Sequence, residues 1–231
     1  MTFPSTSQNP AYAVVFDLDG TLVDSLDDLR DSLNRVLGEL GRRPVETAEA
    51  RAMVGDGAAK LVERALAVTG AVEPGWDRHL TRFLEIYEAA LAARSAPYPG
   101  VMEGLTELKA LGYTLAICTN KPERPTRDLL DALGISGFFD AVAGGDSGPA
   151  RKPDPAVLRS LLDRLEIPPA HAVMVGDHDN DVACARAAGL RSVAVSYGYS
   201  TAPAHSLGAD AVVDTFAEVP GAVRALLSEG R

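Results

Sequence analysis

The chain of 231 residues is 46% hydrophobic, enough to fill the core of one large domain or two modest ones. Its 22 basic and 32 acidic residues leave a net charge of −10, which disfavours nucleic-acid binding as a main function because phosphate backbones favour a basic surface. No apolar run is long enough to cross a bilayer, and residues 1–10 lack the pattern of a secretion signal. We therefore expect a cytoplasmic protein that binds no membrane and begins with a short, poorly ordered tail.

The first predicted strand, residues 12–16, is an apolar run that leads directly to Asp17 and Asp19. Two carboxylates separated by one residue repel each other, by roughly 4 kcal/mol at a separation of about 4 Å and an effective dielectric constant near 20. A chain that holds them together at the end of a strand usually binds a cation or transfers a proton there. This pair therefore indicates a candidate site.

The next segment, residues 26–96, contains no convincing strand. Helical periodicity is visible at residues 26–40, 58–68 and 76–93, and the segment ends at the turn-forming sequence Pro-Tyr-Pro-Gly. We expect an all-helical cap of residues 26–96 inserted into a discontinuous core of residues 1–25 and 97–231. The expected hinges of the cap lie near residues 24–27 and 96–100.

Beyond the insert, short apolar runs alternate with amphipathic stretches of helix length. The sequence predicts strands at residues 113–118, 141–143, 172–175, 192–195 and 211–213, and helices at residues 101–111, 124–133, 156–165, 179–188 and 217–227. Such alternation is typical of right-handed crossovers and a parallel sheet covered on both faces. The predicted fold is a doubly wound, Rossmann-like α/β core. Cys118 and Cys184 lie in apolar surroundings without metal-ligand spacing, so we expect two buried, reduced thiols.

Polar residues follow three of the predicted strands, and ligands of open α/β sheets bind outside the carboxyl ends of the strands. We therefore expect these residues to meet. They are Asp17 and Asp19 after the first strand, Thr119 and Asn120 after the second, and Asp177 and Asp181 after strand 172–175, with Lys152 supplied by a proline-flanked turn.

The four carboxylates and Lys152 together carry a formal charge of −3. Such a site attracts a hard divalent cation, and Mg²⁺ fits because it binds one or two carboxylates and completes its shell with water and phosphate oxygens. Thr119 and the N–H groups at a helix start can hold an anion. A carboxylate nucleophile, a second carboxylic acid, a metal and a lysine together indicate phosphoryl transfer through an aspartyl phosphate.

These motifs resemble the four signatures of the haloacid dehalogenase-like superfamily of phosphohydrolases. The signatures occur in order as DLDGT at residues 17–21, CTN with Thr119, RKPDP with Lys152, and GDHDND at residues 176–181. The resemblance covers nearly the whole chain, including a helical cap between the first and second signatures. Each motif is weak by itself, but four in order are specific.

The resemblance implies a role for each matched residue. Asp17 would attack phosphorus and become an aspartyl phosphate, while Asp19 would protonate the leaving oxygen and then deprotonate water. Thr119 and the Asn120 N–H would bind phosphoryl oxygens, and Lys152 would balance the charge.

The resemblance also implies a Mg²⁺ site on the carboxylates of Asp17 and Asp177 and the carbonyl of Asp19. Asp181 would help directly or through water; the alternative for Asp181 is a salt bridge to Lys152, which is compatible with catalysis. Dehalogenases and phosphonate hydrolases of this superfamily lack an acid at position 19. The acid therefore favours a phosphatase or a phosphomutase.

Within the superfamily, the chain is most similar to the phosphoglycolate phosphatases. The cap sequence of residues 53–66 looks like their Gly-x-Gly turn opening a helix, so Gly55 and Gly57 are expected to expose backbone N–H groups to a small carboxylate. Lys60, Arg64 and Lys121 could add charge, although the alternative for Lys60 and Arg64 is a solvated helix face.

The leading hypothesis is a Mg²⁺-dependent phosphatase that acts on a small phosphorylated metabolite, 2-phosphoglycolate, as a monomer or homodimer. The alternatives are a sugar phosphate such as N-acetylmuramate 6-phosphate, pyrophosphate, a phosphomutase reaction, or a binding protein on a phosphatase scaffold. His178 stands where serine is commoner among relatives, and we expect its side chain to point away from the metal site.

Overall fold

The computed structural model describes residues 11–228, so the tail expected at residues 1–10 lies outside it. Its main sheet is parallel, with the strand order β5-β4-β1-β6-β7-β8. The strands are β1 (Ala13–Phe16), β4 (Thr114–Cys118), β5 (Ala141–Ala143), β6 (Ala172–Gly176), β7 (Arg191–Val195) and β8 (Ala211–Val213). Because the chain starts in the middle of the sheet and winds outward to both edges, the predicted doubly wound α/β core is confirmed.

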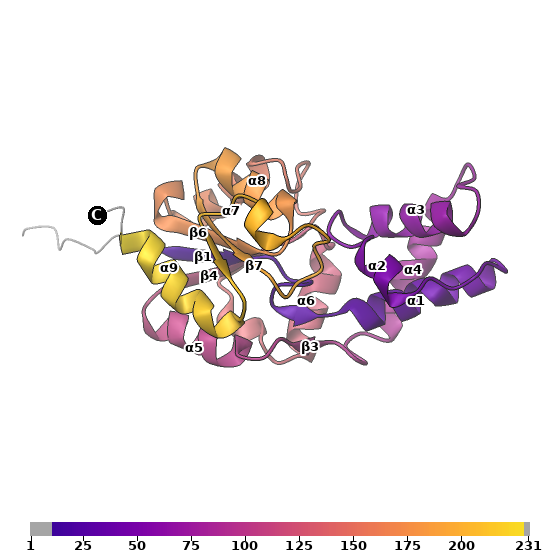
Figure 1. The fold of residues 1–231 in the computed structure, drawn as a ribbon, viewed down its shortest axis with the longest axis horizontal. Coiled ribbons are helices and arrows are strands. Elements are labelled where there is room, and N and C mark those ends of the chain that lie inside the picture. The colour runs from indigo at the N-terminus through magenta and orange to yellow at the C-terminus, as the bar shows by residue number, and fades with distance from the viewer. Residues whose placement is uncertain (1–10, 229–231) are drawn as a thin grey trace, which may run out of the picture.

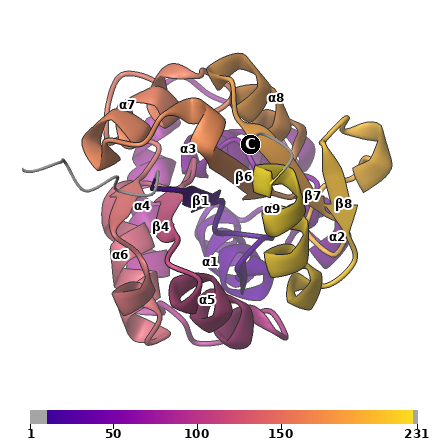
Figure 2. The same ribbon diagram turned by 90° about the vertical axis from the view of Figure 1, so that its left-hand side faces the viewer.

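Helices cover both faces of this sheet (Figure 2). One face is covered by α5 (Val101–Ala110), α6 (Glu123–Ala132) and α9 (Val219–Ser228), and the other by α7 (Ala156–Leu165) and α8 (Asp179–Ala188). Side chains of β1 alternate between the two layers, as the two-residue period of a strand requires. Val14 and Phe16 pack on the first face, and Ala13 and Val15 on the second. Both layers are apolar, which is why the strands read as continuous hydrophobic runs.

A helical group lies beside this core, at the carboxyl ends of the strands (Figure 1). It consists of α1 (Leu26–Glu39), α2 (Thr47–Arg51), α3 (Ala58–Thr69) and α4 (Asp77–Ala89). These helices share one hydrophobic cluster, which includes a single side chain from the core, Tyr199. This clustering supports the proposed division into a core and a cap of residues 26–96. The short helix α2, whose residues Glu46 and Glu49 form a capping box, was not expected from the periodicity.

Two short strands join the segments that lead into and out of the helical group. Strand β2 (Val23–Asp24) pairs antiparallel with β3 (Ala96–Pro97), whereas no strand was expected there. Pairs of two residues carry too little pattern to be found in a sequence. Beside them, the buried carboxylate of Asp28 accepts hydrogen bonds from the backbone N–H groups of Arg94 and Ser95. The two linkers are therefore held together at the base of the cap.

Element ends differ from the expected ones by a few residues. The last cap helix was expected to reach residue 93, but α4 ends at Ala89, and Ala92 has a positive φ of 56°. The remaining elements are 3-10 helices: η1 (Ser136–Phe138), η2 (Pro169–His171), η3 (Ala204–Ser206) and η4 (Phe216–Glu218).

Cys118 and Cys184 are buried free thiols, as expected. Within residues 11–228, no helix combines the length and apolar character that a membrane span requires.

Candidate active site

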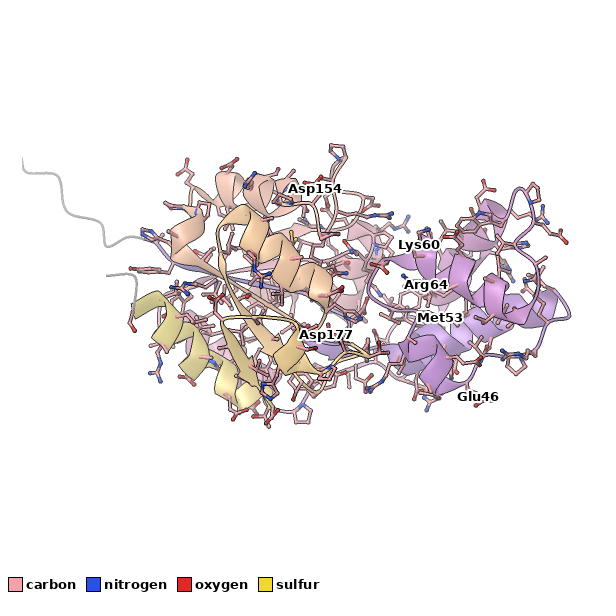
Figure 3. The ribbon with its side chains drawn as sticks, turned by 45° about the horizontal axis from the view of Figure 1, so that its top comes forward. Glu46, Met53, Lys60, Arg64, Asp154 and Asp177 are labelled. Atoms are coloured by element: carbon pink, nitrogen blue, oxygen red, sulfur yellow. The ribbon has the colours of Figure 1, made fainter. Side chains whose placement is uncertain are left out.

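The candidate site residues lie at the carboxyl ends of three neighbouring strands. The register pairs Phe16 of β1 with Ile117 of β4 and with Val175 of β6, so the three strands end at one level. The structure brings together Asp17, Asp19, Thr119, Asn120, Lys152, Asp177 and Asp181, with Gly55 and Gly57 approaching from the cap. Figure 3 shows Asp177 on the part of the core that faces the cap residues Met53 and Arg64.

Lys152 is fully enclosed between two of these carboxylates. Its Nζ lies 2.9 Å from Asp17 Oδ1 and 2.6 Å from Asp181 Oδ1, and only 3% of the residue is exposed. Burial opposes its charge, but the charges of Asp17 and Asp181 outweigh burial and raise the pKa of Lys152 above its usual range. The ammonium group is therefore held beside Asp17 as a fixed positive charge.

Asp181 has both carboxylate oxygens occupied by the protein. Oδ1 binds Lys152, and Oδ2 accepts a hydrogen bond of 3.0 Å from the backbone N–H of His178. Burial, together with the charges of Asp17 and Asp177, raises the pKa of Asp181, and Lys152 acts in the opposite direction. This arrangement fits a residue that orients Lys152, which is the alternative considered for Asp181 from the sequence.

Asp177 is fully buried and held by two donors. The Thr21 hydroxyl donates to Oδ1 at 3.2 Å, and the backbone N–H of Tyr199 donates to Oδ2 at 2.7 Å. Ligand atoms of Asp177, His178 and Asp181 all lie within 4.8 Å of one another. Asp17 Oδ1 contacts Lys152 but makes no hydrogen bond. This set of buried carboxylate oxygens fits a hard divalent cation, so an acidic cluster suited to a metal is present.

His178 does not point away from this cluster, so that expectation was wrong. Its Nδ1 lies 2.9 Å from Asp177 Oδ2, and its ring lies against the cap, where a Cβ added to Gly55 would be 2.8 Å from His178 Cδ2. Burial lowers its pKa, but in the absence of a cation the close contact with the charged Asp177 carboxylate outweighs burial and raises it to about 9. The contact of His178 with Gly55 could not be read from the sequence, because the cap loop comes from a distant part of the chain.

Asp19 is bound by Ser25 and by a lysine. The Ser25 hydroxyl donates to Asp19 Oδ1 at 2.6 Å, and Lys121 Nζ lies 3.2 Å from Oδ2. Lys121 also donates a hydrogen bond of 2.9 Å to the hydroxyl oxygen of Tyr87 on α4. Burial opposes the charge of Lys121, but Asp19 and Tyr87 raise its pKa. Neither Ser25 nor Tyr87 was singled out from the sequence, because no local pattern marks them.

The cap loop meets the core through its glycines. The carbonyl oxygen of Gly55 accepts hydrogen bonds from the side-chain amides of Asn120, at 3.0 Å, and Asn180, at 2.9 Å. Gly57 has a φ of +89°, and a Cβ there would lie 2.8 Å from the carbonyl oxygen of Asn120. The two glycines therefore permit a close approach of cap to core. Their expected role in binding a carboxylate stays a prediction.

A cavity separates this part of the cap from the strand ends. It opens to solvent and is lined by Asp17, Asp19, Thr119 and Lys121 of the core and by Leu61, Phe83 and Tyr87 of the cap. Lys60 and Arg64 do not line it: Lys60 pairs with Glu63 at 2.6 Å, and Arg64 pairs with Asp56 and donates to the carbonyl of Met53. The solvated-face alternative for these two residues therefore fits the structure.

The chain is similar to known proteins over most of its length. The family model described as haloacid dehalogenase-like hydrolase matches residues 14–195. A phosphoglycolate phosphatase of Rhodospirillum rubrum is 48% identical over 213 residues, which cover 90% of this chain and 88% of that protein. A phosphoglycolate phosphatase of Caulobacter vibrioides is 42% identical, with coverages of 93% and 92%.

Solved protein structures also superpose on this chain over most of its length. A predicted phosphoglycolate phosphatase from Haemophilus somnus superposes with a TM-score of 0.87 at 34% identity, covering 92% of this chain and 97% of its own. CbbY from Rhodobacter sphaeroides, in complex with xylulose-1,5-bisphosphate, superposes with a TM-score of 0.77 at 28% identity, covering 90% and 96%.

Proposed function

Since this chain belongs to the haloacid dehalogenase-like hydrolases, we propose that it hydrolyses 2-phosphoglycolate to glycolate and phosphate with Mg²⁺, through an aspartyl phosphate on Asp17. The sequence resemblance to this family is confirmed, and the chain is a phosphoric monoester hydrolase. The finer proposal is carried by one observation: Asp17, Asp19 and Thr119 line the cavity between cap and core, and Lys152 lies directly behind Asp17. The naming of the curated relatives supports 2-phosphoglycolate as the substrate.

The first half of the proposed reaction transfers the phosphoryl group to Asp17. A carboxylate oxygen of Asp17 attacks phosphorus as the bond between phosphorus and the glycolate oxygen breaks. Asp19 gives its proton to that leaving oxygen, so that glycolate leaves as an alcohol. Lys152, 2.9 Å from Asp17, stabilises the negative charge that gathers there.

Thr119 is placed to hold the transferring group. Its Oγ1 accepts a hydrogen bond of 3.3 Å from the backbone N–H of Lys121, which leaves its own proton free to bind a phosphoryl oxygen. The residue lies at the end of β4 and is 3% exposed, so its orientation is fixed by the strand.

The second half returns Asp17 to its starting state. Asp19, now a carboxylate, takes a proton from water, and the water oxygen attacks phosphorus as the bond to Asp17 breaks. Phosphate leaves and Asp19 is again protonated. Ser25 and Lys121 hold the Asp19 carboxylate in place for both steps.

Asp17 and Asp177 are the residues that would hold Mg²⁺, together with the carbonyl of Asp19. When bound, Mg²⁺ neutralises charge on the phosphoryl oxygens and aligns them with the nucleophile. The carboxylates contribute hard oxygen ligands, and the fixed orientation of Asp177 by Thr21 and Tyr199 suits a preformed site.

The test is phosphate release from a panel containing 2-phosphoglycolate, N-acetylmuramate 6-phosphate, glucose phosphates and pyrophosphate. Each compound is measured with Mg²⁺ and with a chelator, beside Asp17→Asn. We expect the highest kcat/KM for 2-phosphoglycolate, and we expect phosphate release to disappear when the chelator is added and in Asp17→Asn. Turnover that favours another compound would reject the substrate, and turnover retained by Asp17→Asn would reject the nucleophile.

A further inference from the structure

The cavity between cap and core offers few groups that can bind a second anionic group of a substrate. Among the cavity-lining residues that the structure describes, Lys121 has the only cationic side chain. Lys152 lies behind Asp17, with only 1% of its side chain exposed. A substrate that carries a carboxylate as well as a phosphate therefore meets one cation in this cavity besides any bound metal.

Lys121 and Tyr87 together present hydrogen-bond donors at one corner of the cavity. The Lys121 ammonium has three donors, of which Asp19 and the Tyr87 hydroxyl oxygen use two. Tyr87 accepts from Lys121, and within residues 11–228 no acceptor receives its own proton. Burial keeps that proton on the hydroxyl, because it raises the pKa of Tyr87. The pair can thus donate one hydrogen bond from nitrogen and one from oxygen.

Much of the cap lining beside this corner is apolar. It is formed by Leu61, Phe83 and Leu84 of the cap, and the ring of Phe83 stacks on that of Tyr87 at a centroid distance of 6.0 Å. A carboxylate placed against these side chains would lose its hydration without a partner. The Lys121–Tyr87 corner can replace that hydration with two side-chain donors, one of them charged.

Electrostatics favours the same corner. The carboxylate of a substrate bound near Asp17 would be repelled by the carboxylate of Asp17, the proposed nucleophile. Lys121 Nζ, 3.2 Å from Asp19 Oδ2, places a positive charge at this corner that offsets the repulsion.

We infer that Lys121 Nζ and Tyr87 Oη form a subsite that binds the substrate carboxylate and selects short phosphomonoesters bearing a carboxylate. This inference rests on the proposed function and adds the residues that set its specificity. The substrates must be short because Lys121 contacts Asp19, which lies two residues from the proposed nucleophile Asp17 and lines the same cavity, so that phosphate and carboxylate are bound close together.

The test compares two substrates of equal carbon number, 2-phosphoglycolate and ethyl phosphate, which lacks the carboxylate. Tyr87→Phe keeps the ring on Phe83 and removes only the hydroxyl. We expect its kcat/KM for 2-phosphoglycolate to fall roughly tenfold to a hundredfold, mainly through KM, as for loss of a hydrogen bond to a charged group. Its kcat/KM for ethyl phosphate should stay close to that of the unmodified enzyme.

Two further variants complete the comparison. Lys121→Met also loses a contact with Asp19, so it should slow both substrates, but 2-phosphoglycolate by at least tenfold more. Lys60→Met removes an exposed lysine of the cap that pairs with Glu63, and it should leave the ratio of the two kcat/KM values unchanged. Circular dichroism and thermal unfolding confirm that each variant is folded.

The outcomes separate the inference from the function on which it rests. If the unmodified enzyme prefers 2-phosphoglycolate and both variants at the subsite retain that preference, the inference is wrong and the proposed function stands. An equal loss of kcat/KM for 2-phosphoglycolate and ethyl phosphate would also overturn the inference, since Lys121 and Tyr87 would then act through Asp19 alone. If the unmodified enzyme shows no preference for 2-phosphoglycolate, the proposed substrate itself is wrong.

Discussion

Replacing Asp181 by asparagine tests whether this residue orients Lys152 or binds the metal. In the structure, Lys152 Nζ lies 2.6 Å from Asp181 Oδ1 and 2.9 Å from Asp17 Oδ1, and all three side chains are buried. Asp181→Asn removes one of the two charges that compensate the buried ammonium. Removing a partner from a buried ion pair typically costs about 3–5 kcal/mol of stability. Because Asp17 remains beside Lys152, we expect a loss near the lower end of that range.

The same change should lower kcat more than it alters metal binding. Without Asp181, Lys152 is oriented by Asp17 alone, so its charge is less well placed when the phosphoryl group arrives. We expect kcat at saturating Mg²⁺ to fall by about tenfold or more, equivalent to about 1.4 kcal/mol or more in the activation free energy. The Mg²⁺ concentration for half-maximal activity should change by less than about threefold, because both oxygens of Asp181 are bound within the protein.

The assays are urea unfolding and a Mg²⁺ titration of phosphate release. Asp163→Asn, which changes an exposed aspartate on α7, is the matched control and should leave both measurements unchanged. A tenfold rise in the Mg²⁺ requirement with an unchanged kcat at saturation would refute the reasoning. Asp181 would then be a metal ligand, the other role considered for it.

Three other predictions concern the cap. Asp28→Ala removes the buried carboxylate that accepts hydrogen bonds from the backbone N–H groups of Arg94 and Ser95. We expect the free energy of unfolding, measured by urea titration, to fall by about 3 kcal/mol. A loss below about 1 kcal/mol would show that water replaces the carboxylate. Asn180→Ala deletes one of the two side-chain amides that bind the Gly55 carbonyl. We expect KM to rise severalfold and proteolysis of the linkers to accelerate. If KM and the rate of proteolysis are both unchanged, Asn180 does not hold the cap in place. Gly57→Ala places a Cβ 2.8 Å from the carbonyl oxygen of Asn120, at a residue whose φ is +89°. We expect kcat/KM to fall by about tenfold or more while the core stays folded. Full activity would show that the cap loop is not needed in this position.

The core and its carboxylates could be predicted because each signal is contained in one segment. A strand such as β6 is a continuous apolar run, and the residue that follows it, Asp177, is placed at the carboxyl edge by the strand itself. Parallel pairing then brings the ends of β1, β4 and β6 together. The positions of Asp17, Asp19, Thr119 and Asp177 follow from these local facts and one topological rule. The functional roles of its residues remain proposals.

The cap was harder to read, since helical periodicity shows which face of a helix is buried but not what it is buried against. The α4 pattern indicates that Tyr87 points inward, and it does so toward Lys121, which follows β4 in the core. The same holds for His178, which meets Gly55 of the cap loop. The short strands β2 and β3 pair only two residues each, which is too little pattern for a prediction.

The sequence by itself determined the α/β core, the position of the helical insert and the carboxylates at the strand ends, because period, strand length and strand order act along short stretches of chain. The tertiary structure decided which residues from outside the strand ends reach that edge: Tyr87 and Gly55 of the cap, which lie beside Lys121 and between two amides, and Ser25, which binds Asp19. These contacts join segments that are mostly far apart in the chain, and they depend on how the cap packs on the core. No local preference of the chain encodes that packing, so only the folded arrangement of cap and core specifies these contacts.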